Sequence, residues 1–311
     1  MDFIELISGL IILLIGGEFI VKGAVLVANK FHMSPMVIGL TIVSFGTSAP
    51  ELLVSIKAAI EGNPDIAVGN VVGSNIANLA LVLGITVLFI PIVIDRSKIM
   101  INWVFMMLAT IVFYLFSING WVEEWEGIIL FLALIIFIFF SIRFSDKKSP
   151  EDSEHTLTNN TNQKPIVIIL YLILGIFGLY FGAEFLVEGA VSIAHKLGMS
   201  EAVIGVTIVA LGTSAPELTA SIVAAYRKES GISIGNLIGS NIFNIMAVIG
   251  ITGMVKPISI SSKIMSFDMY WLLGISLMIL PLIIIGSRIG RLKGLLLLIV
   301  YISYIALVLN C

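Results

Sequence analysis

Ten long apolar segments follow one another along this chain, and they limit its fold more than any other feature. Each approaches or exceeds the roughly 20 apolar residues that a helix needs to cross a membrane. Only 12% of the residues are charged, about half the share found in soluble domains, which excludes a soluble enzyme and a nucleic-acid-binding protein. The segments are continuous rather than alternating, so we predict an all-α polytopic membrane protein with ten transmembrane helices and not an outer-membrane barrel. The segments are residues 3–29, 36–60, 66–93, 99–117, 126–143, 166–194, 202–226, 232–255, 265–286 and 291–309.

A polar segment, residues 145–165, divides the chain into two halves with five apolar segments each. It carries charges of both signs and no apolar run, which indicates a flexible linker. We therefore predict two five-helix repeat units, at residues 1–144 and 166–311. If the N-terminus lies outside, the loops on the side of the linker hold most of the Lys and Arg residues. Because positive charge collects in cytoplasmic loops, we expect the linker in the cytoplasm, both termini outside, and the chain in the cell membrane.

The two halves contain the same sequence. Residues 16–85 align with residues 182–251 without a gap, at a constant offset of 166, and about 39 of the 70 aligned positions are identical. The strongest matches lie within residues 41–84 and 207–250. Because each half has an odd number of predicted spans, the second copy enters the membrane from the opposite side. Such inverted-topology repeats are typical of secondary transporters, which bind their substrate near the middle of the membrane between the repeats.

One motif, Gly-Thr-Ser-Ala-Pro-Glu, interrupts the second apolar segment of each half. Pro50 has no N–H group, so the carbonyl of Gly46 loses its helical partner, and Pro216 does the same to Gly212. Irregular backbone at membrane depth is tolerated where it is buried in protein or lines a cavity. The freed carbonyl oxygens are therefore candidate ligands for a cation.

Hydroxyl, amide and carboxylate side chains gather at both breaks. In the first half, Thr47 and Ser48 precede Glu51 by four and three residues, so all three can share one helix face. Oxygen ligands without His or Cys select hard cations such as Na⁺ and Ca²⁺. The candidates are Thr47, Ser48, Glu51, Ser74 and Asn78 in the first half and Thr213, Ser214, Glu217, Ser240 and Asn244 in the second.

Some of these positions also fit a purely structural role. A Ser or Thr in a membrane helix often bonds to its own backbone, and Gly73 and Gly239 favour close packing of helices. The glutamates are different, because a carboxylate at the bilayer centre costs about 2.5–3.5 kcal/mol. We therefore expect Glu51 and Glu217 to be functional.

A second pair of acids, Glu18 and Glu184, is also related by the repeat. Glu18 could pair with Lys22 one helical turn later, whereas Glu184 has Glu188 at that place. These acids could serve an accessory role or simply face lipid headgroups.

The GTSAPE and GSNIxN motifs, each present twice, resemble the α-repeats of the Ca²⁺/cation antiporter superfamily, and most of all those of prokaryotic sodium/calcium exchangers. The resemblance covers essentially the whole chain and implies a cluster of four cation positions between the second, third, seventh and eighth spans. It implies that Glu51, Glu217, Thr47 and Thr213 hold Ca²⁺, and that Asn78 and Asn244 line the centre. It also implies two flanking sodium sites, one with Ser48, Ser74 and the carbonyl of Ser44, the other with Ser214, Ser240 and the carbonyl of Ala210.

The resemblance further implies an antiporter that exchanges about three Na⁺ for one Ca²⁺ by alternating access, with the first helices of the two halves sliding against the rest. It implies no enzymatic activity and no cofactor, and we expect a monomer in the lipid bilayer whose other partners are Na⁺ and Ca²⁺. Some members carry Asp at the position of Asn244, including potassium-dependent exchangers. The Asn argues against potassium coupling and leaves the number of Na⁺ open. The alternatives are an antiporter coupled to H⁺ or carrying another divalent cation, and, less favoured, a cation channel.

Overall fold

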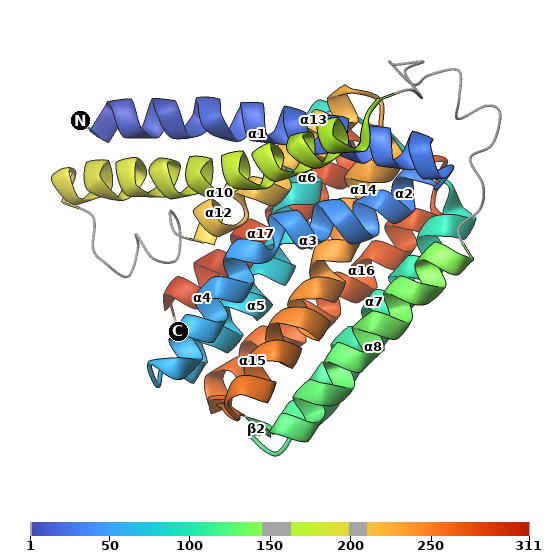
Figure 1. The fold of residues 1–311 in the computed structure, drawn as a ribbon. Coiled ribbons are helices and arrows are strands. Elements are labelled where there is room, and N and C mark those ends of the chain that lie inside the picture. The colour runs from blue at the N-terminus through green and yellow to red at the C-terminus, as the bar shows by residue number, and fades with distance from the viewer. Residues whose placement is uncertain (1, 145–162, 199–209, 311) are drawn as a thin grey trace.

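The computed structural model describes residues 2–144, 163–198 and 210–310, which form a bundle of helices with two pairs of short strands (Figure 1). The elements of the first half are α1 (Asp2–Phe31), α2 (Pro35–Ile38), η1 (Gly39–Val43), α3 (Ser44–Thr47), α4 (Ala49–Ile60), α5 (Pro64–Ile76), η2 (Ala77–Val82), α6 (Leu83–Phe89), β1 (Ile92–Val93), α7 (Arg96–Ser117), β2 (Trp121–Val122) and α8 (Glu124–Arg143). Those of the second half are α10 (Pro165–Lys196), α12 (Ala210–Thr213), α13 (Ala215–Tyr226), α14 (Ser230–Phe243), η4 (Asn244–Ile249), α15 (Gly250–Val255), β3 (Ile258–Ser259), η5 (Ile264–Asp268), α16 (Met269–Ile284), β4 (Arg288–Ile289) and α17 (Arg291–Asn310).

Nine predicted spans coincide with apolar helices of sufficient length. Eight are continuous, and the ninth is a bent pair, Pro35–Thr47 and Ala49–Ile60, whose parts meet at 45°. The predicted span at 202–226 is described only from residue 210, so the expected total of ten lies partly outside the described residues. The third span ends at Phe89 and not at the predicted residue 93, because Ile92 pairs with Ile289 in a short antiparallel ladder. A second ladder pairs β2 with β3.

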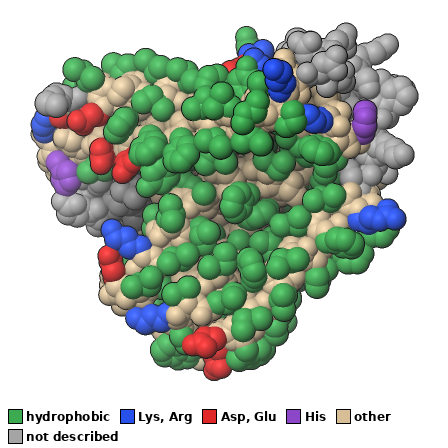
Figure 2. Space-filling model, viewed as in Figure 1, with side chains coloured by type: hydrophobic (Ala, Val, Ile, Leu, Met, Phe, Trp, Pro, Cys, Tyr) green, Lys and Arg blue, Asp and Glu red, His purple; other side chains and the backbone are tan. Residues whose placement is uncertain are grey.

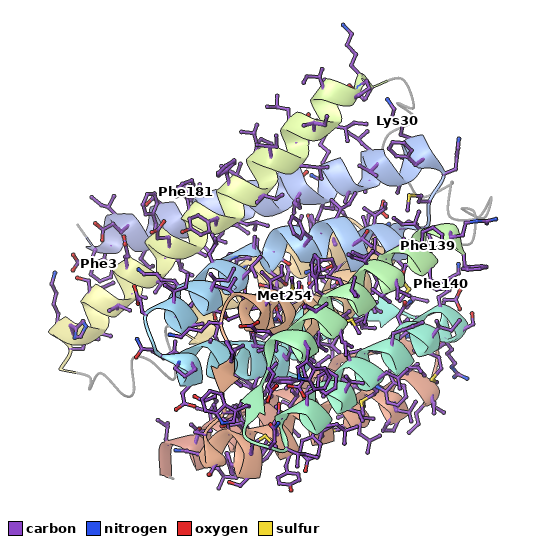
Figure 3. All side chains as sticks on the ribbon, turned by 60° about the horizontal axis from the view of Figure 1, so that its bottom comes forward. Phe3, Lys30, Phe139, Phe140, Phe181 and Met254 are labelled. Carbon is purple, nitrogen blue, oxygen red and sulfur yellow. The ribbon has the colours of Figure 1, made fainter. Side chains whose placement is uncertain are left out.

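The two longest helices, α1 and α10, lie side by side on one flank of the bundle (Figures 1 and 3). Glycines let their backbones touch: a Cβ atom at Gly16 would lie 2.6 Å from the backbone nitrogen of Leu179. Gly9 meets Leu186 in the same way, so residue numbers fall along α10 as they rise along α1 and the helices are antiparallel. We infer that α1 and α10 form one tightly packed unit.

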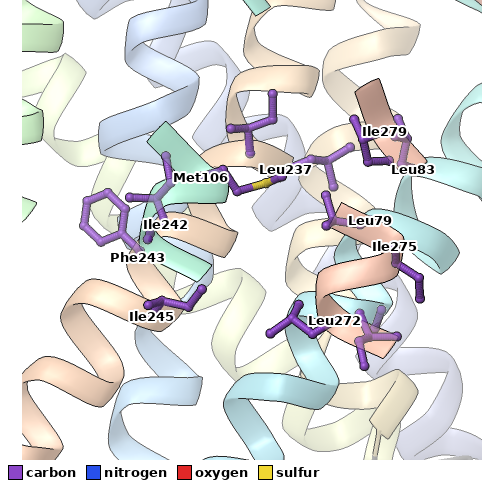
Figure 4. Close-up of a cluster of buried hydrophobic side chains, with 14 of the residues drawn as sticks. Leu79, Leu83, Met106, Leu237, Ile242, Phe243, Ile245, Leu272, Ile275 and Ile279 are labelled. Carbon is purple, nitrogen blue, oxygen red and sulfur yellow. The ribbon is translucent and has the colours of Figure 1, made fainter. Parts of the chain in front are cut away.

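The most buried spans run through the centre of the molecule. In Pro64–Phe89 and in Ser230–Val255, 83% of the most apolar window is buried, against 22–50% in the other continuous spans. Both spans change from α-helix to π-helix, the first at Ala77 and the second at Asn244. Such π-turns occur often at functional sites. Leucine, isoleucine and methionine side chains from α7, α14, α16 and η2 fill the space around them (Figure 4).

The outer surface is covered by apolar side chains. On the face of the molecule that Figure 2 shows, hydrophobic side chains cover the middle and charged side chains lie mostly toward the edges. Large apolar residues such as Leu132, Ile173 and Ile302 are exposed on the outer helices. A surface of this kind fits a lipid environment rather than water.

Candidate cation site

Both halves break their helix at the same serine. Ser48, between α3 and α4, has φ −87° and ψ 3°, and Ser214, between α12 and α13, has φ −87° and ψ 2°. A proline stands in the first turn of each following helix, where its missing N–H group costs nothing. The predicted interruption of both segments is confirmed, and each break lies three residues before a glutamate.

Glu51 and Glu217 are fully buried in the first turns of α4 and α13. The first turns of α4 and α13 meet here, because Ser48, three residues before Glu51, contacts Glu217. Ser48 donates a hydrogen bond to Oε1 of Glu217 at 3.3 Å. Oε2 of Glu217 and both carboxylate oxygens of Glu51 accept no hydrogen bond from any residue that the structure describes. A buried acceptor without a partner carries its full desolvation cost, so three oxygens here are free to bind a cation or a proton.

Thr47 connects the first half of the chain to the second. Its Oγ1 atom lies 3.2 Å from Oγ of Ser240 and donates to Oδ1 of Asn236 at 3.1 Å. The same hydroxyl also contacts the carbonyl oxygen of Ser44 at 3.3 Å. Together with the bond from Ser48 to Glu217, these contacts group residues of α3 with residues of α13 and α14. The resemblance implied a grouping of Ser48 with Ser74 within the first half, and the side-chain hydrogen bond that the structure gives Ser48 is the one to Glu217.

Asn78, in the first turn of η2, and Asn244, in the first turn of η4, lie in the same buried region but have different contacts. Asn244 donates from Nδ2 to Oγ of Ser74 and to Oδ1 of Asn75, both at 3.0 Å, while its own Oδ1 accepts no bond from the residues described. Asn78, the repeat equivalent of Asn244, makes no side-chain hydrogen bond within the described part of the chain. Both are fully buried, so their free amide atoms need a partner beyond the residues described.

The structure describes only some of the remaining predicted residues. Ser214 is buried, and its hydroxyl makes no hydrogen bond to a described residue. Thr213 ends α12 and is half-buried. Ala210 begins α12, so its carbonyl lies one turn before the break, as that of Ser44 does in the first half. Residues 207–209 of the predicted second motif lie outside the described residues.

Oxygen is the only ligand type that this region offers. Among the residues that the structure describes, no cluster of three or more His, Cys, Asp or Glu side chains could hold a metal ion. The site therefore combines two carboxylates with neutral hydroxyl, amide and carbonyl oxygens. Such a set suits a hard cation such as Na⁺ or Ca²⁺ rather than zinc or copper.

Comparison with known proteins decides the family. The sequence profile described as "Sodium/calcium exchanger protein" matches residues 2–143 and 167–310. The chain belongs to the sodium/calcium exchanger family. Among its relatives, the putative antiporter CaxA of Alkalimonas amylolytica is 37% identical over 307 residues, 97% of this chain and 96% of CaxA. The sodium/calcium exchanger MaX1 of Methanosarcina acetivorans is 30% identical over 341 residues, 98% of this chain and 97% of MaX1.

The fold agrees with this membership. Solved structures of the sodium-calcium exchanger NCX_Mj are similar to this chain, one of them with a TM-score of 0.84 at 34% identity, covering 98% of each chain. The exchanger described here is therefore a multi-span helical membrane protein of a transporter family.

Two asparagines support the site of this exchanger, and the sequence analysis missed them. Asn70 donates to the carbonyl of Glu51 at 3.3 Å and to Ser55 at 3.1 Å. Asn236 donates in the same way, to the carbonyl of Glu217 at 3.4 Å and to Ser221 at 3.0 Å. Each fixes the helix that carries a site glutamate to the span that follows it. The Gly-Asn pair that is identical in both repeats was the available signal.

Two further expectations can be compared with the structure. Gly239 is a packing position, as predicted, because a Cβ there would lie 2.7 Å from the carbonyl oxygen of Leu40. The same prediction for Gly73 is wrong, because a Cβ there would meet no atom of the described residues within 4 Å. The predicted pairing of Glu18 with Lys22 is wrong. Lys22 instead places its ammonium over the ring of Tyr171, 4.6 Å from the centroid, and Glu18 pairs with Arg227 of α13. The two partners lie on α10 and at the end of α13, so a rule based on spacing within one helix cannot predict them.

Proposed function

We propose that this protein is a secondary antiporter that exchanges Na⁺ for Ca²⁺ by alternating access, with about three Na⁺ per Ca²⁺. The observation that supports it most is the pair of buried carboxylates, Glu51 and Glu217, which present three oxygens without a donor among the described residues, beside two helix breaks. Two negative charges can balance one desolvated Ca²⁺. The proposal needs no cofactor and no enzymatic step.

We assign the ions to the residues as follows. Glu51, Glu217, Thr47 and Thr213 hold Ca²⁺ between the two breaks, and the amides of Asn78 and Asn244 line the centre. One flanking sodium site uses the carbonyl of Ser44, Ser48 and Ser240, since the contacts of Thr47 and Ser48 bring these groups together with Glu217. By the repeat, the other uses the carbonyl of Ala210, Ser214 and Ser74.

The proposed stoichiometry supplies enough free energy for calcium extrusion. A tenfold Na⁺ gradient supplies about 1.4 kcal/mol per ion, so roughly 4 kcal/mol for three ions. One net charge that moves inward adds about 2.3 kcal/mol per 100 mV. The total of roughly 6.4 kcal/mol can hold a Ca²⁺ gradient on the order of 10⁴ to 10⁵.

Alternating access is assigned to the unit formed by α1 and α10, which slides against the site-bearing helices. The close antiparallel packing of these two helices supports their movement as one body. In this proposal the chain is a monomer of ten spans in two inverted halves, in the cell membrane, with both termini outside and the linker in the cytoplasm.

Transport by the purified protein tests the proposal. The protein is reconstituted in lipid vesicles, and uptake of ⁴⁵Ca²⁺ is followed while gradients of Na⁺, K⁺ and H⁺ are imposed one at a time. We expect saturable uptake that requires Na⁺ inside the vesicle and is unaffected by K⁺. Uptake driven by a proton gradient alone would favour the H⁺-coupled alternative, and uptake that does not saturate would indicate a channel.

A further inference from the structure

A chain of buried amides crosses between the two central spans. Asn75, near the end of α5, donates from Nδ2 to the backbone carbonyl of Asn241 on α14 at 3.3 Å. Its Oδ1 accepts from Nδ2 of Asn244 at 3.0 Å. Asn75 and Asn244 are both fully buried, so no bulk water competes for these bonds. The sequence analysis did not single out Asn75.

The direction of these bonds is fixed by one of their ends. A backbone carbonyl can only accept a hydrogen bond, so Asn75 must turn its NH₂ group toward Asn241. Its oxygen then faces Asn244, so Asn244 must donate from its own NH₂ group. The same group also donates to Oγ of Ser74 at 3.0 Å. If the amide of Asn244 were rotated by half a turn, two oxygens would face each other without a proton between them. The oxygen of Asn244 therefore points away from Asn75, and no described residue donates a hydrogen bond to it.

We propose that Asn75 is a positioning residue for cation binding, which holds Asn244 so that its amide oxygen, and not its NH₂ group, faces the ions. This inference rests on the proposed function, in which Asn244 lines the centre of the cation cluster. A cation binds a carbonyl oxygen and is repelled by an amide N–H group. Without Asn75, the amide of Asn244 can present either end, and part of the population presents the wrong one.

The repeat equivalent of Asn75 has no such role and offers a matched control. Asn241 is also buried, but its Nδ2 donates to the carbonyl of Leu237 in its own helix at 2.8 Å, and its Oδ1 makes no bond to a described residue. Asn78, which would be its partner by the repeat, makes no side-chain hydrogen bond. Replacing the side chain of Asn241 therefore removes a buried amide of equal size without disturbing Asn244.

Calcium titration calorimetry on the full-length protein in detergent tests the proposal. The variants are Asn75→Leu, Asn241→Leu, Asn244→Leu and the double variant of residues 75 and 244. We expect Asn75→Leu to weaken Ca²⁺ binding about tenfold or more, as is usual when the partner that orients a metal ligand is removed. Asn241→Leu should change it less than about twofold. The double variant should bind as Asn244→Leu does, because Asn75 acts only through Asn244.

Three outcomes would overturn the proposal: unchanged binding in Asn75→Leu, equal losses in Asn75→Leu and Asn241→Leu, or additive losses in the double variant. Thermal unfolding without ions shows whether each variant is folded, and Asn75→Ser, which is too short to reach both partners, replaces Asn75→Leu if the latter does not purify as one species. The proposed function is tested separately by the wild type and Glu217→Gln. Failure of the wild type to bind Ca²⁺, or normal binding by Glu217→Gln, would overturn the function and this inference together.

Discussion

Arg227, at the end of α13, donates hydrogen bonds to both carboxylate oxygens of Glu18, in the middle of α1; Nε reaches Oε2 at 3.1 Å and Nη2 binds Oε1. Gly17 allows this approach, since a Cβ there would lie 2.8 Å from Cγ2 of Thr219. The repeat equivalents of Glu18 and Arg227 are Glu184 and Glu61, two acids that cannot form such a pair. The ion pair therefore favours docking of α1 on α13 and has no counterpart for α10 on α4.

This asymmetry predicts a biased transport cycle. An ion pair of this exposure contributes on the order of 1 kcal/mol, which changes an equilibrium constant about fivefold. Suppose that α1 leaves α13 when the exchanger opens on the side of the linker. Loss of the ion pair in Glu18→Gln then favours this open state, and the apparent Ca²⁺ affinity on the linker side should rise about fivefold relative to the opposite side. The measurement is Ca²⁺ uptake into vesicles of known orientation. Glu184→Gln is the control, and the exchanged pair Glu18→Arg with Arg227→Glu should restore the original ratio. The same change in Glu184→Gln would show that the pair sets no bias.

Glu51 and Glu217 should each be required for calcium binding. Glu51→Gln or Glu217→Gln removes half of the charge that balances a desolvated divalent cation, so we expect Ca²⁺ binding to be abolished in calorimetric titration. Glu126→Gln is a matched control, because Glu126 is also buried but caps the start of α8. Near-normal Ca²⁺ affinity in either site variant would show that the site is assigned to the wrong residues.

The sequence predicted local features well and contacts between distant segments poorly. Apolar length located nine spans, and the missing N–H groups of Pro50 and Pro216 located both breaks, because each effect acts within a single helix. The contact of Thr47 with Ser240 and the pairing of Glu18 with Arg227 depend on how helices cross. A repeat shows which residues are equivalent but not which ones meet. For the same reason Asn75 and Asn241 look alike in sequence and differ in every side-chain contact.

The serines of the flanking sites should separate sodium from calcium. Ser240→Ala or Ser74→Ala removes one neutral ligand of a proposed sodium site and leaves both carboxylates in place, so we expect a larger effect on the Na⁺ dependence of exchange than on Ca²⁺ affinity. Both are measured in the same vesicles. Ser117→Ala serves as control, since this buried serine bonds only to its own helix at Phe113. Equal losses of Na⁺ dependence and Ca²⁺ affinity would refute the division into separate sites.

The contact between α1 and α10 should tolerate no added methyl group. In Gly16→Ala the new Cβ would lie 2.6 Å from the backbone of Leu179, and such overpacking costs about 1–3 kcal/mol. The control is Gly274→Ala on α16, where a Cβ would meet no atom of the described residues within 4 Å. This variant should be neutral or stabilising by up to about 1 kcal/mol. Thermal unfolding of both variants in detergent distinguishes the two. An unchanged melting temperature in Gly16→Ala would mean that the helices are not held in this close contact.

Protons should compete with calcium for the same carboxylate oxygens. Glu51 and Glu217 carry the only carboxylates in the described part of the site, and the amides of Asn78 and Asn244 do not titrate. A proton bound to either glutamate removes one of the charges that attract Ca²⁺, so acid should weaken the apparent Ca²⁺ affinity, and saturating Ca²⁺ should largely overcome the inhibition. The measurement is Ca²⁺ uptake as a function of pH at low and at saturating Ca²⁺. Equally deep inhibition at both concentrations would place the titrating group outside the site, with Glu18 and Glu184 the next to be replaced. Uptake driven by acid on the far side without Na⁺ would replace sodium coupling with proton coupling.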